Sequence, residues 1–481
     1  MTVVIRRVLE ILPPLVTAAL AAAALGMWIS QGPGVVLTER LPGADHAPSP
    51  TAAAPGSPGP IPPGPLPSEA LGGERTAGPA VPSDLPGDWP GFRGPGRDGI
   101  RPDGEAAKLA RSWPAGGPPP LWALPVGEGY AGPAVHAGRV YLLDYDRENQ
   151  RDALRCLSLA DGREIWRYSY PVKVKRDHGM SRTVPAVTDR YVVSLGPRCH
   201  VLCLDSATGQ FRWAMDLPRQ FGTKVPLWHA GQCPLIDGGR AILAPAGKDA
   251  LMVCVDCETG RIVWTTPNPM GWKMTHSSVA PMELADRRTY VYCGSGGVVG
   301  VSAADGTILW QTTAWKIHTT IATPVPLPGG KIFLAGGYNK GAMMLQLDEA
   351  GGKIIPRVLF RLKPRVFGAT QQTPIFYKGF LYGVRPDGEL ACLDPDGKVR
   401  WTSGQADRFG LGPFLIADGM ILVMDDSGVL TMAAASPDAY VLLARANVLD
   451  GHDSWGPMAI AGGRLLARDL TRMVCLDVAG R

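Results

Sequence analysis

Residues 203–213 read CLDSATGQFRW, and nearly the same phrase returns three more times along the chain. The other copies are CLSLADGREIW at residues 156–166, CVDCETGRIVW at residues 254–264 and CLDPDGKVRW at residues 392–401. A catalytic motif usually occurs once, whereas a phrase that recurs at a regular spacing is typical of a structural repeat. The phrase therefore predicts a repeated building block.

A second landmark accompanies the phrase, namely a proline that opens a short apolar run. It occurs eight times, at intervals of 39–52 residues, at Pro133, Pro185, Pro234, Pro281, Pro324, Pro374, Pro413 and Pro457. Strand-like segments such as RVYLLD follow, and the 60 Gly and 46 Pro provide many turns. Four short strands in about 45 residues is the period of a propeller blade. We therefore predict an all-β fold, an eight-bladed β-propeller of four-stranded antiparallel blades.

The phrase has a structural interpretation within such a blade. Asp205 and Gly209 suit a hairpin turn, since Asp accepts backbone N–H groups and Gly supplies a positive φ. Trp213 then lies on the outermost strand, where its ring covers the seam between two blades. The segment LWALPVG (residues 121–127) matches an outermost strand but precedes the first proline landmark. We expect it to pair with residues 473–477 and close the ring, which hides both edges.

The N-terminal region differs from the repeats. Arg6 and Arg7 precede 19 uncharged residues at positions 11–29, long enough for a helix to span a membrane. The positive charges predict a cytoplasmic N-terminus and a membrane-anchored propeller on the extracytoplasmic (periplasmic) side. A cleavable signal peptide is the rival interpretation. The predicted organisation is a signal anchor (1–40), a Pro/Ala/Gly-rich linker (41–87) and the propeller (88–481).

Charge argues against nucleic acid as a partner. The chain has 48 Lys plus Arg and 43 Asp plus Glu, a formal net charge of +5, with no concentrated basic block. The acidic stretch at residues 144–152 lacks the glycine and the final glutamate of a calcium loop, and is predicted to be a solvated turn. The cysteines of the phrase are predicted to be packed, unreactive thiols, and no metal site is predicted.

The repeat, the proline landmarks and DWPGFRGPGRDG at residues 88–99 together resemble the PQQ-like (quinoprotein alcohol dehydrogenase-like) β-propeller family. That family includes quinoprotein alcohol dehydrogenases, polyvinyl-alcohol-dehydrogenase-type proteins and a scaffold of outer-membrane assembly. For the enzymes, the resemblance implies PQQ stacked between a Trp and a disulfide of adjacent cysteines, with Ca²⁺ and an Asp base. No two cysteines are adjacent in this sequence. We expect Trp89 and Phe92 to pack on the flank of the propeller.

The candidate site lies in the loops before the proline landmarks, which share one face of a propeller. Basic, imidazole and aromatic side chains converge there and suit an anion or a quinone such as PQQ. An alternative is that they only plug the channel mouth. The candidate residues are Lys175, His178, Lys224, Trp228, His229, Trp272, Lys273, His276, Trp315, Lys316, His318, Arg365, Gln371, Arg408, His452 and Trp455.

Two functions are compatible with this pattern. The first is a non-catalytic, membrane-tethered module that binds a protein partner or an anionic small molecule, because no nucleophile–base constellation is evident. The second is a PQQ-dependent oxidoreductase acting on alcohols or sugars. Fold alone does not separate them, because one fold hosts many functions.

Overall fold

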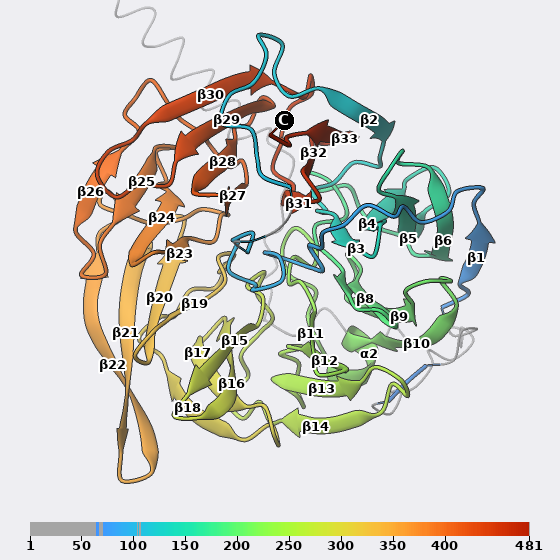
Figure 1. The fold of residues 1–481 in the computed structure, drawn as a ribbon. Helices are drawn as coiled ribbons and strands as arrows, with labels where there is room; N and C mark the ends of the chain where they lie inside the picture. The colour runs from blue at the N-terminus through green and yellow to red at the C-terminus, as the bar shows by residue number, and fades with distance from the viewer. Residues whose placement is uncertain (1–63, 67–70, 103, 105–106, 481) are drawn as a thin grey trace, which may run out of the picture. The chain divides into compact units, whose positions relative to one another are not determined.

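The eight predicted blades are present. The computed structural model describes residues 64–66, 71–102, 104 and 107–480. Its strands form eight antiparallel sheets, each with at least four strands, around a central axis (Figure 1). The chain divides into units of residues 1–59 and 60–481, and all that follows concerns the second.

Blades 1 to 4 follow the chain from the innermost strand outward. Their strands are β3 (Ala134–His136), β4 (Arg139–Asp146), β5 (Arg151–Ser158) and β6 (Glu164–Pro171); β7 (Ala186–Val187), β8 (Tyr191–Leu195), β9 (His200–Asp205) and β10 (Phe211–Asp216); β11 (Leu235–Asp237), β12 (Arg240–Leu243), β13 (Met252–Asp256) and β14 (Ile262–Thr266); β15 (Ala280–Leu284), β16 (Arg287–Gly294), β17 (Gly297–Ser302) and β18 (Ile308–Thr312). The helix α2 (Leu217–Phe221) follows blade 2.

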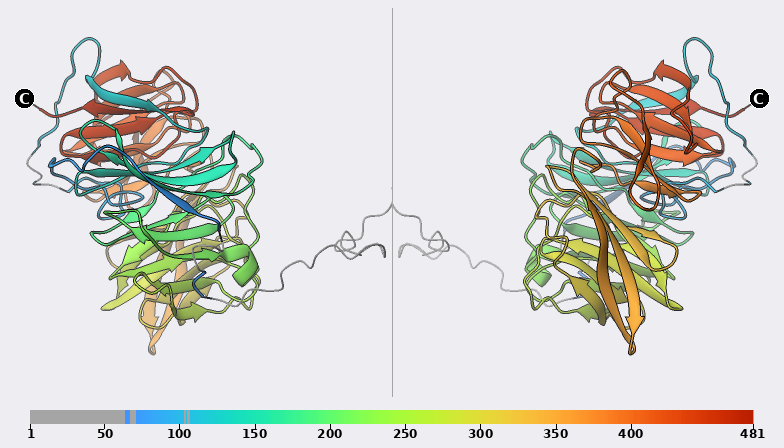
Figure 2. Two further views of the ribbon diagram at one scale, coloured as in Figure 1. Left: turned by 90° about the vertical axis from the view of Figure 1, so that its right-hand side faces the viewer. Right: turned by 90° about the vertical axis from the view of Figure 1, so that its left-hand side faces the viewer.

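Blades 5 to 8 repeat this order. Their strands are β19 (Val325–Leu327), β20 (Lys331–Gly336), β21 (Gly341–Ala350) and β22 (Lys353–Leu362); β23 (Ile375–Tyr377), β24 (Phe380–Val384), β25 (Leu390–Leu393) and β26 (Val399–Thr402); β27 (Phe414–Ala417), β28 (Met420–Met424), β29 (Val429–Ala434) and β30 (Leu442–Asn447); β31 (Ala459–Ala461), β32 (Arg464–Arg468), β33 (Arg472–Asp477) and β2 (Pro120–Pro125). The β21–β22 hairpin extends past the rest of its blade (Figure 2).

Where it carries the Trp, the recurring phrase links one blade to the next. In blade 2, Trp213 lies opposite Cys203, directly after a β-bulge. Its indole Nε1 donates to the Cys257 carbonyl in the turn of blade 3, at 2.9 Å. Gly260 of that turn has φ 70°, and a Cβ there would lie 2.6 Å from the Trp213 ring. The prediction that the Trp covers the seam between blades is confirmed, and the Gly provides the space that the ring occupies.

Blades 5 and 7 have no Trp on their outermost strands, and among the other six blades the same contact recurs with one exception. Trp122, Trp166, Trp264 and Trp401 each donate to a carbonyl of the following blade at 2.9–3.1 Å. Trp310 of blade 4 lies opposite Gly300 instead of a cysteine, and its Nε1 has no hydrogen-bond partner among the described residues. The following blade carries the long β21–β22 hairpin in place of the phrase.

The ring closes as predicted. Strand β2 pairs with β33, so that the N-terminal strand completes the last blade. A segment within the predicted linker also contacts the ring: β1 (Glu74–Ala77) adds a fifth strand to blade 1, and Leu66 bridges Ala214 of blade 2. The linker boundary at residue 88 stays a prediction.

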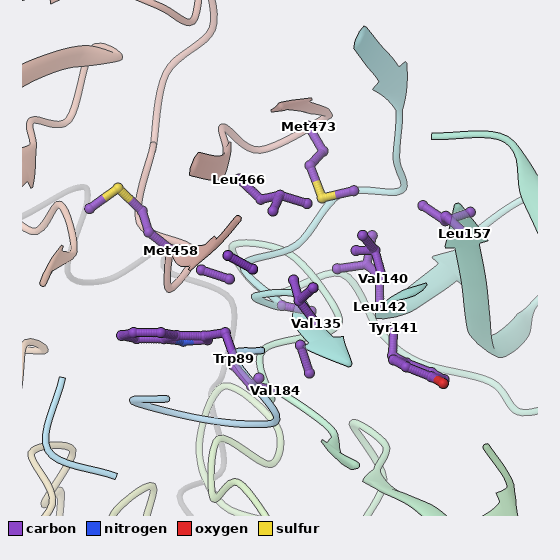
Figure 3. Packing of buried hydrophobic residues seen from close by; sticks show 14 of the residues in the cluster. Trp89, Val135, Val140, Tyr141, Leu142, Leu157, Val184, Met458, Leu466 and Met473 are labelled. Atoms are coloured by element: carbon purple, nitrogen blue, oxygen red, sulfur yellow. The ribbon is translucent and has the colours of Figure 1, made fainter. Parts of the chain in front are cut away.

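Residues 88–101, here called the plug segment, cross the centre of the ring (Figure 1). The expectation that Trp89 and Phe92 pack on the flank is wrong, because both line a cavity at the centre of the ring. Trp89 exchanges two 2.8 Å backbone hydrogen bonds with Val135 of the innermost strand β3, and it is 2% exposed. Figure 3 shows it beside Val135, Val184 and Met458. The innermost strands surround an apolar channel, and burying a large ring there removes more apolar surface from water than a contact on the flank.

Polar contacts hold the plug segment in place. The Arg93 guanidinium donates to the carbonyls of Thr373 and Pro374 in blade 6, at 2.9 and 3.0 Å. Arg101 N–H donates to the Ile416 carbonyl of blade 7 at 2.8 Å. The Arg101 side chain, which is buried, forms an ion pair with Asp418 at 3.2 Å. The plug segment thus contacts blade 1 near the start of the propeller and blades 6 and 7 near its end.

No helix in the described part of the chain is long and apolar enough to span a membrane. The predicted anchor at residues 11–29 lies outside that part.

Candidate functional site

A cavity of about 320 Å³ lies at the centre of the ring, with the plug segment forming part of its wall. Consecutive strands of a blade are antiparallel, so the connections into the innermost strands and the hairpins between second and third strands share one face, here called the loop face. The cavity is lined from this face by Tyr130, His178, Arg182, Trp228, Gly231, His276, Ser278, Ile321, Tyr338, Gln371, Leu411 and Trp455, and from the plug segment by Trp89, Phe92, Arg93 and Gly99.

Aromatic rings form two stacks in the lining. Trp228 stacks on His276 and on Tyr338, with ring centroids 6.1 Å apart in both pairs and interplanar angles of 23° and 30°. Trp455 stacks on Tyr130 at 5.2 Å and 29°. Stacked rings are flat and have little conformational freedom to lose, which suits the binding of another flat or apolar group.

Two guanidinium groups bring positive charge to the cavity. Arg182 lies over the Tyr130 ring, 4.9 Å from its centroid, and donates to the carbonyls of Trp228 and Asp177. Burial lowers the pKa of Arg182, and it lowers that of Arg93 to about 10. The lining contains no Asp or Glu in the described part of the chain. The cavity therefore favours an apolar or aromatic ligand that carries negative charge.

Two histidines at the cavity, His276 and His229, have lowered pKa values. Burial, followed by the nearby Arg182 charge, lowers the pKa of His276 to about 4. Burial also lowers the pKa of His229, whose Nε2 donates to the Lys175 carbonyl at 2.8 Å. A histidine with a pKa near 4 is a weak base at neutral pH, and a general base works best with a pKa near the working pH.

Non-glycine residues with left-handed backbone conformations cluster in the lining. The φ angles of His178, Trp228 and Tyr338 are 58°, 63° and 53°. Such conformations are costly for side chains of this size and are concentrated at functional sites. With Arg93 of the plug segment, whose φ is 67°, four such residues surround one cavity and support its assignment as the functional site.

The structure brings only some of the predicted site residues to the cavity. His178, Trp228, His276, Gln371 and Trp455 line it. The predicted cations are exposed and lie outside the lining: Lys175, Lys224, Lys273, Lys316, Arg365 and Arg408.

The other predicted residues have different positions. Trp272 and Trp315 are packed within blades, 5% and 3% exposed, and are absent from the lining. His229 is buried beside the cavity, and His318 and His452 are exposed on the loop face. Whether any of these residues binds a ligand stays a prediction.

Sequence reasoning missed Tyr130, Arg182 and Tyr338. A signal was present for the first two, because both lie three residues before a proline landmark. The same position supplies four more lining residues: Gly231, Ser278, Ile321 and Gln371. Tyr338 lies in a hairpin between second and third strands, which no repeated motif marks. The plug segment was missed because it is not part of the repeat.

The architecture is that of a PQQ-like repeat propeller. The profile of the PQQ_2 family, described as outer membrane protein assembly factor BamB, matches residues 150–403. The chain belongs to this family.

Two relatives and one solved structure resemble the chain. It is 32% identical over 169 residues to the serine/threonine-protein kinase AfsK of Streptomyces griseus, covering 34% of this chain but only 18% of the kinase. It is 22% identical over 284 residues to BamB of Moranella endobia (strain PCIT), covering 55% of this chain and 67% of that protein. BamB of Moraxella catarrhalis superposes with a TM-score of 0.52 at 16% identity, covering 75% of this chain and 99% of that one. The structural likeness shows the fold alone.

The cavity lining does not fit the calcium-bound quinone that the resemblance implies for the dehydrogenases. Cys233 is the single cysteine of the lining, which also lacks a carboxylate in the described region. Within the described ranges, no group of His, Cys, Asp and Glu side chains could hold a metal ion. All nine cysteines are buried free thiols. The disulfide, the calcium ligands and the Asp base thus have no counterparts at this cavity.

Proposed function

We propose that this protein is a non-catalytic binding module whose ligand enters the central cavity from the loop face. The observation that carries the proposal is the composition of the lining: stacked aromatic rings and two guanidinium groups, without a carboxylate among the described lining residues. Such a lining binds a ligand but offers no acid–base pair for a reaction. Membership of a family whose profile is described by an assembly factor supports a module of this kind.

We also propose where the module works. The apolar segment at residues 11–29 would anchor the chain in a membrane, and residues 41–87 would connect the anchor to the propeller on the extracytoplasmic side. The arginines before the segment support this orientation. A protease added to intact spheroplasts should therefore degrade the propeller, whereas protection of the propeller would place it in the cytoplasm.

The test of the non-catalytic assignment is a dye-linked dehydrogenase assay. The full chain is incubated with PQQ and Ca²⁺ and supplied with alcohols and sugars, and a known quinoprotein dehydrogenase serves as the positive control. We expect no substrate-dependent reduction of the dye. Reduction that depends on PQQ and disappears in an Arg182→Gln variant would instead establish the quinoprotein oxidoreductase.

A further inference from the structure

We propose that the cavity mouth binds an acidic polypeptide segment that inserts one aromatic side chain into the cavity. This inference rests on the proposed function and names the ligand class of the same site. It follows from three features of the loop face: an exposed apolar patch, a cavity the size of a single anchor, and a rim of cations.

The apolar patch borders the cavity. Leu227 is 63% exposed and Tyr338 is 51% exposed. Trp228 follows Leu227 in the chain and stacks on the Tyr338 ring, so the three residues form one patch. Large exposed apolar side chains beside a hollow are characteristic of protein-binding surfaces, in which aromatic anchors fill pockets.

The cavity suits one anchor. Its volume of about 320 Å³ is at the small end of the range for ligand sites. The rings of Trp228, Trp455 and Tyr130 offer flat surfaces to an inserted aromatic group. The Trp228 indole N–H and the Gln371 side-chain amide form no hydrogen bond with any described residue, so they are available to polar groups of a bound backbone.

Six cations, here called the rim, come from six of the eight loops that lead into innermost strands on the loop face. The six are the exposed Lys175, Lys224, Lys273, Lys316, Arg365 and Arg408, and they come from the same loops that supply the cavity lining. None forms an ion pair with another residue in the described part of the chain.

Three carboxylates on the same face already have partners, whereas Asp177 and Asp249 form no ion pair in the described part of the chain. Asp407 pairs with Arg445 at 2.5 Å, Asp426 accepts from Trp455 Nε1 at 2.7 Å, and Asp453 accepts from the Tyr130 hydroxyl at 3.2 Å. Of these three carboxylates only Asp407 is neutralised by a cation, because Trp455 and Tyr130 are neutral donors. Lys224, Lys273 and Lys316 come from three successive loops that contain no Asp or Glu, so an acidic partner would supply counter-charge there.

The position of the cations favours a polypeptide over a small anion. They do not line the cavity, so a molecule that fills only the cavity leaves them without a counter-charge. A segment lying across the mouth places its anchor inside and its flanking carboxylates over the rim. Aromatic anchors supply most of the affinity of such interfaces, and rim charges mainly speed association.

The test uses labelled peptides and the full chain. The probe is a fluorescein-labelled peptide of sequence DEWED, and its matched controls are DEAED, which lacks the anchor, and KKWKK, which reverses the charge. We expect DEWED to bind with an affinity at least about tenfold higher than either control. Its binding should weaken as salt is raised, because salt screens exposed charges.

Variants locate the binding surface. Lys224→Glu combined with Lys316→Glu should weaken DEWED binding about tenfold or more. The control combines Lys353→Glu with Lys398→Glu, which makes the same charge change at exposed positions where fourth strands begin, on the opposite face. This control should leave the affinity unchanged. Tyr338→Ala, a change at an exposed side chain, should also weaken binding.

Three results with bound peptide would overturn the inference. They are equal binding of DEWED and DEAED, equal effects of the two lysine pairs, and displacement of DEWED by free indole-3-acetate at the same concentration as by unlabelled DEWED. The last result would assign the cavity to a small molecule. The absence of any peptide binding also overturns the inference, while the dehydrogenase assay separately decides whether the module is non-catalytic.

Discussion

Replacing Trp213 and Trp310 by Phe should have very different effects on stability, although both indoles are buried on equivalent outermost strands. Trp213→Phe removes the 2.9 Å hydrogen bond to the Cys257 carbonyl. Trp310→Phe removes a buried N–H that has no partner among the described residues. The two changes delete the same ring atoms, so the cavity contributions are similar.

The magnitude follows from the hydrogen bonds. Losing a net intramolecular hydrogen bond costs about 1 kcal/mol, whereas removing an unsatisfied buried group recovers about 1–3 kcal/mol. The free energy of unfolding should therefore fall by about 2–4 kcal/mol more in Trp213→Phe than in Trp310→Phe. The assay is urea unfolding monitored by circular dichroism for the wild type and both variants. Equal m-values in the three proteins would show that the variants change stability and not the surface exposed on unfolding. Equal losses in the two variants would refute the interlock between blades.

Three further predictions follow from packing and charge. Deleting residues 1–127 should lower the Tm far more than deleting residues 1–118, because only the first removes the closing strand β2; equal Tm values would contradict closure. The phrase cysteines should resist alkylation in the native protein and react after denaturation, as burial raises their pKa values, to about 11 for Cys254; rapid native labelling would show that they are accessible. Burial raises the pKa of Asp152 to about 7, above its unfolded value, so its contribution to stability should decline as pH rises from about 4 to 7. An Asp152→Asn variant should lack this decline, and an unchanged pH profile of Tm would exclude it.

The ring could be predicted from the sequence because every blade packs in the same environment, between two neighbouring blades. Each sheet is covered by two neighbours, so its strands are apolar on both faces, and the phrase with its turn and Trp recurs. Blade 4 shows the limit of this reasoning. Gly300 replaces the cysteine and Trp310 keeps its place in the phrase, but only the three-dimensional contact shows that its N–H lacks the usual acceptor.

The candidate site was only partly predictable. Repetition identified the loop face, and five of the proposed residues line the cavity. It did not show how far each side chain reaches toward the axis, so Trp272 entered the candidate set although it packs within a blade. The plug segment was out of reach for a different reason. A segment that occurs once has no period, and the position of Trp89 depends on the channel that the other blades create.

The closing strand has a consequence for how the chain is made. Pro120 of β2 pairs with Leu476, more than 350 residues later, and the plug segment bonds to blades 6 and 7 as well as to blade 1. The first part of the propeller to leave the ribosome must therefore wait for the last part before its backbone hydrogen bonds can form. Contacts of such sequence separation slow folding. A chain that stops before blade 8 leaves one sheet edge open and the N-terminal strand without its partner, a pair of edges that invites aggregation. The architecture thus makes completion of translation a condition for a closed fold.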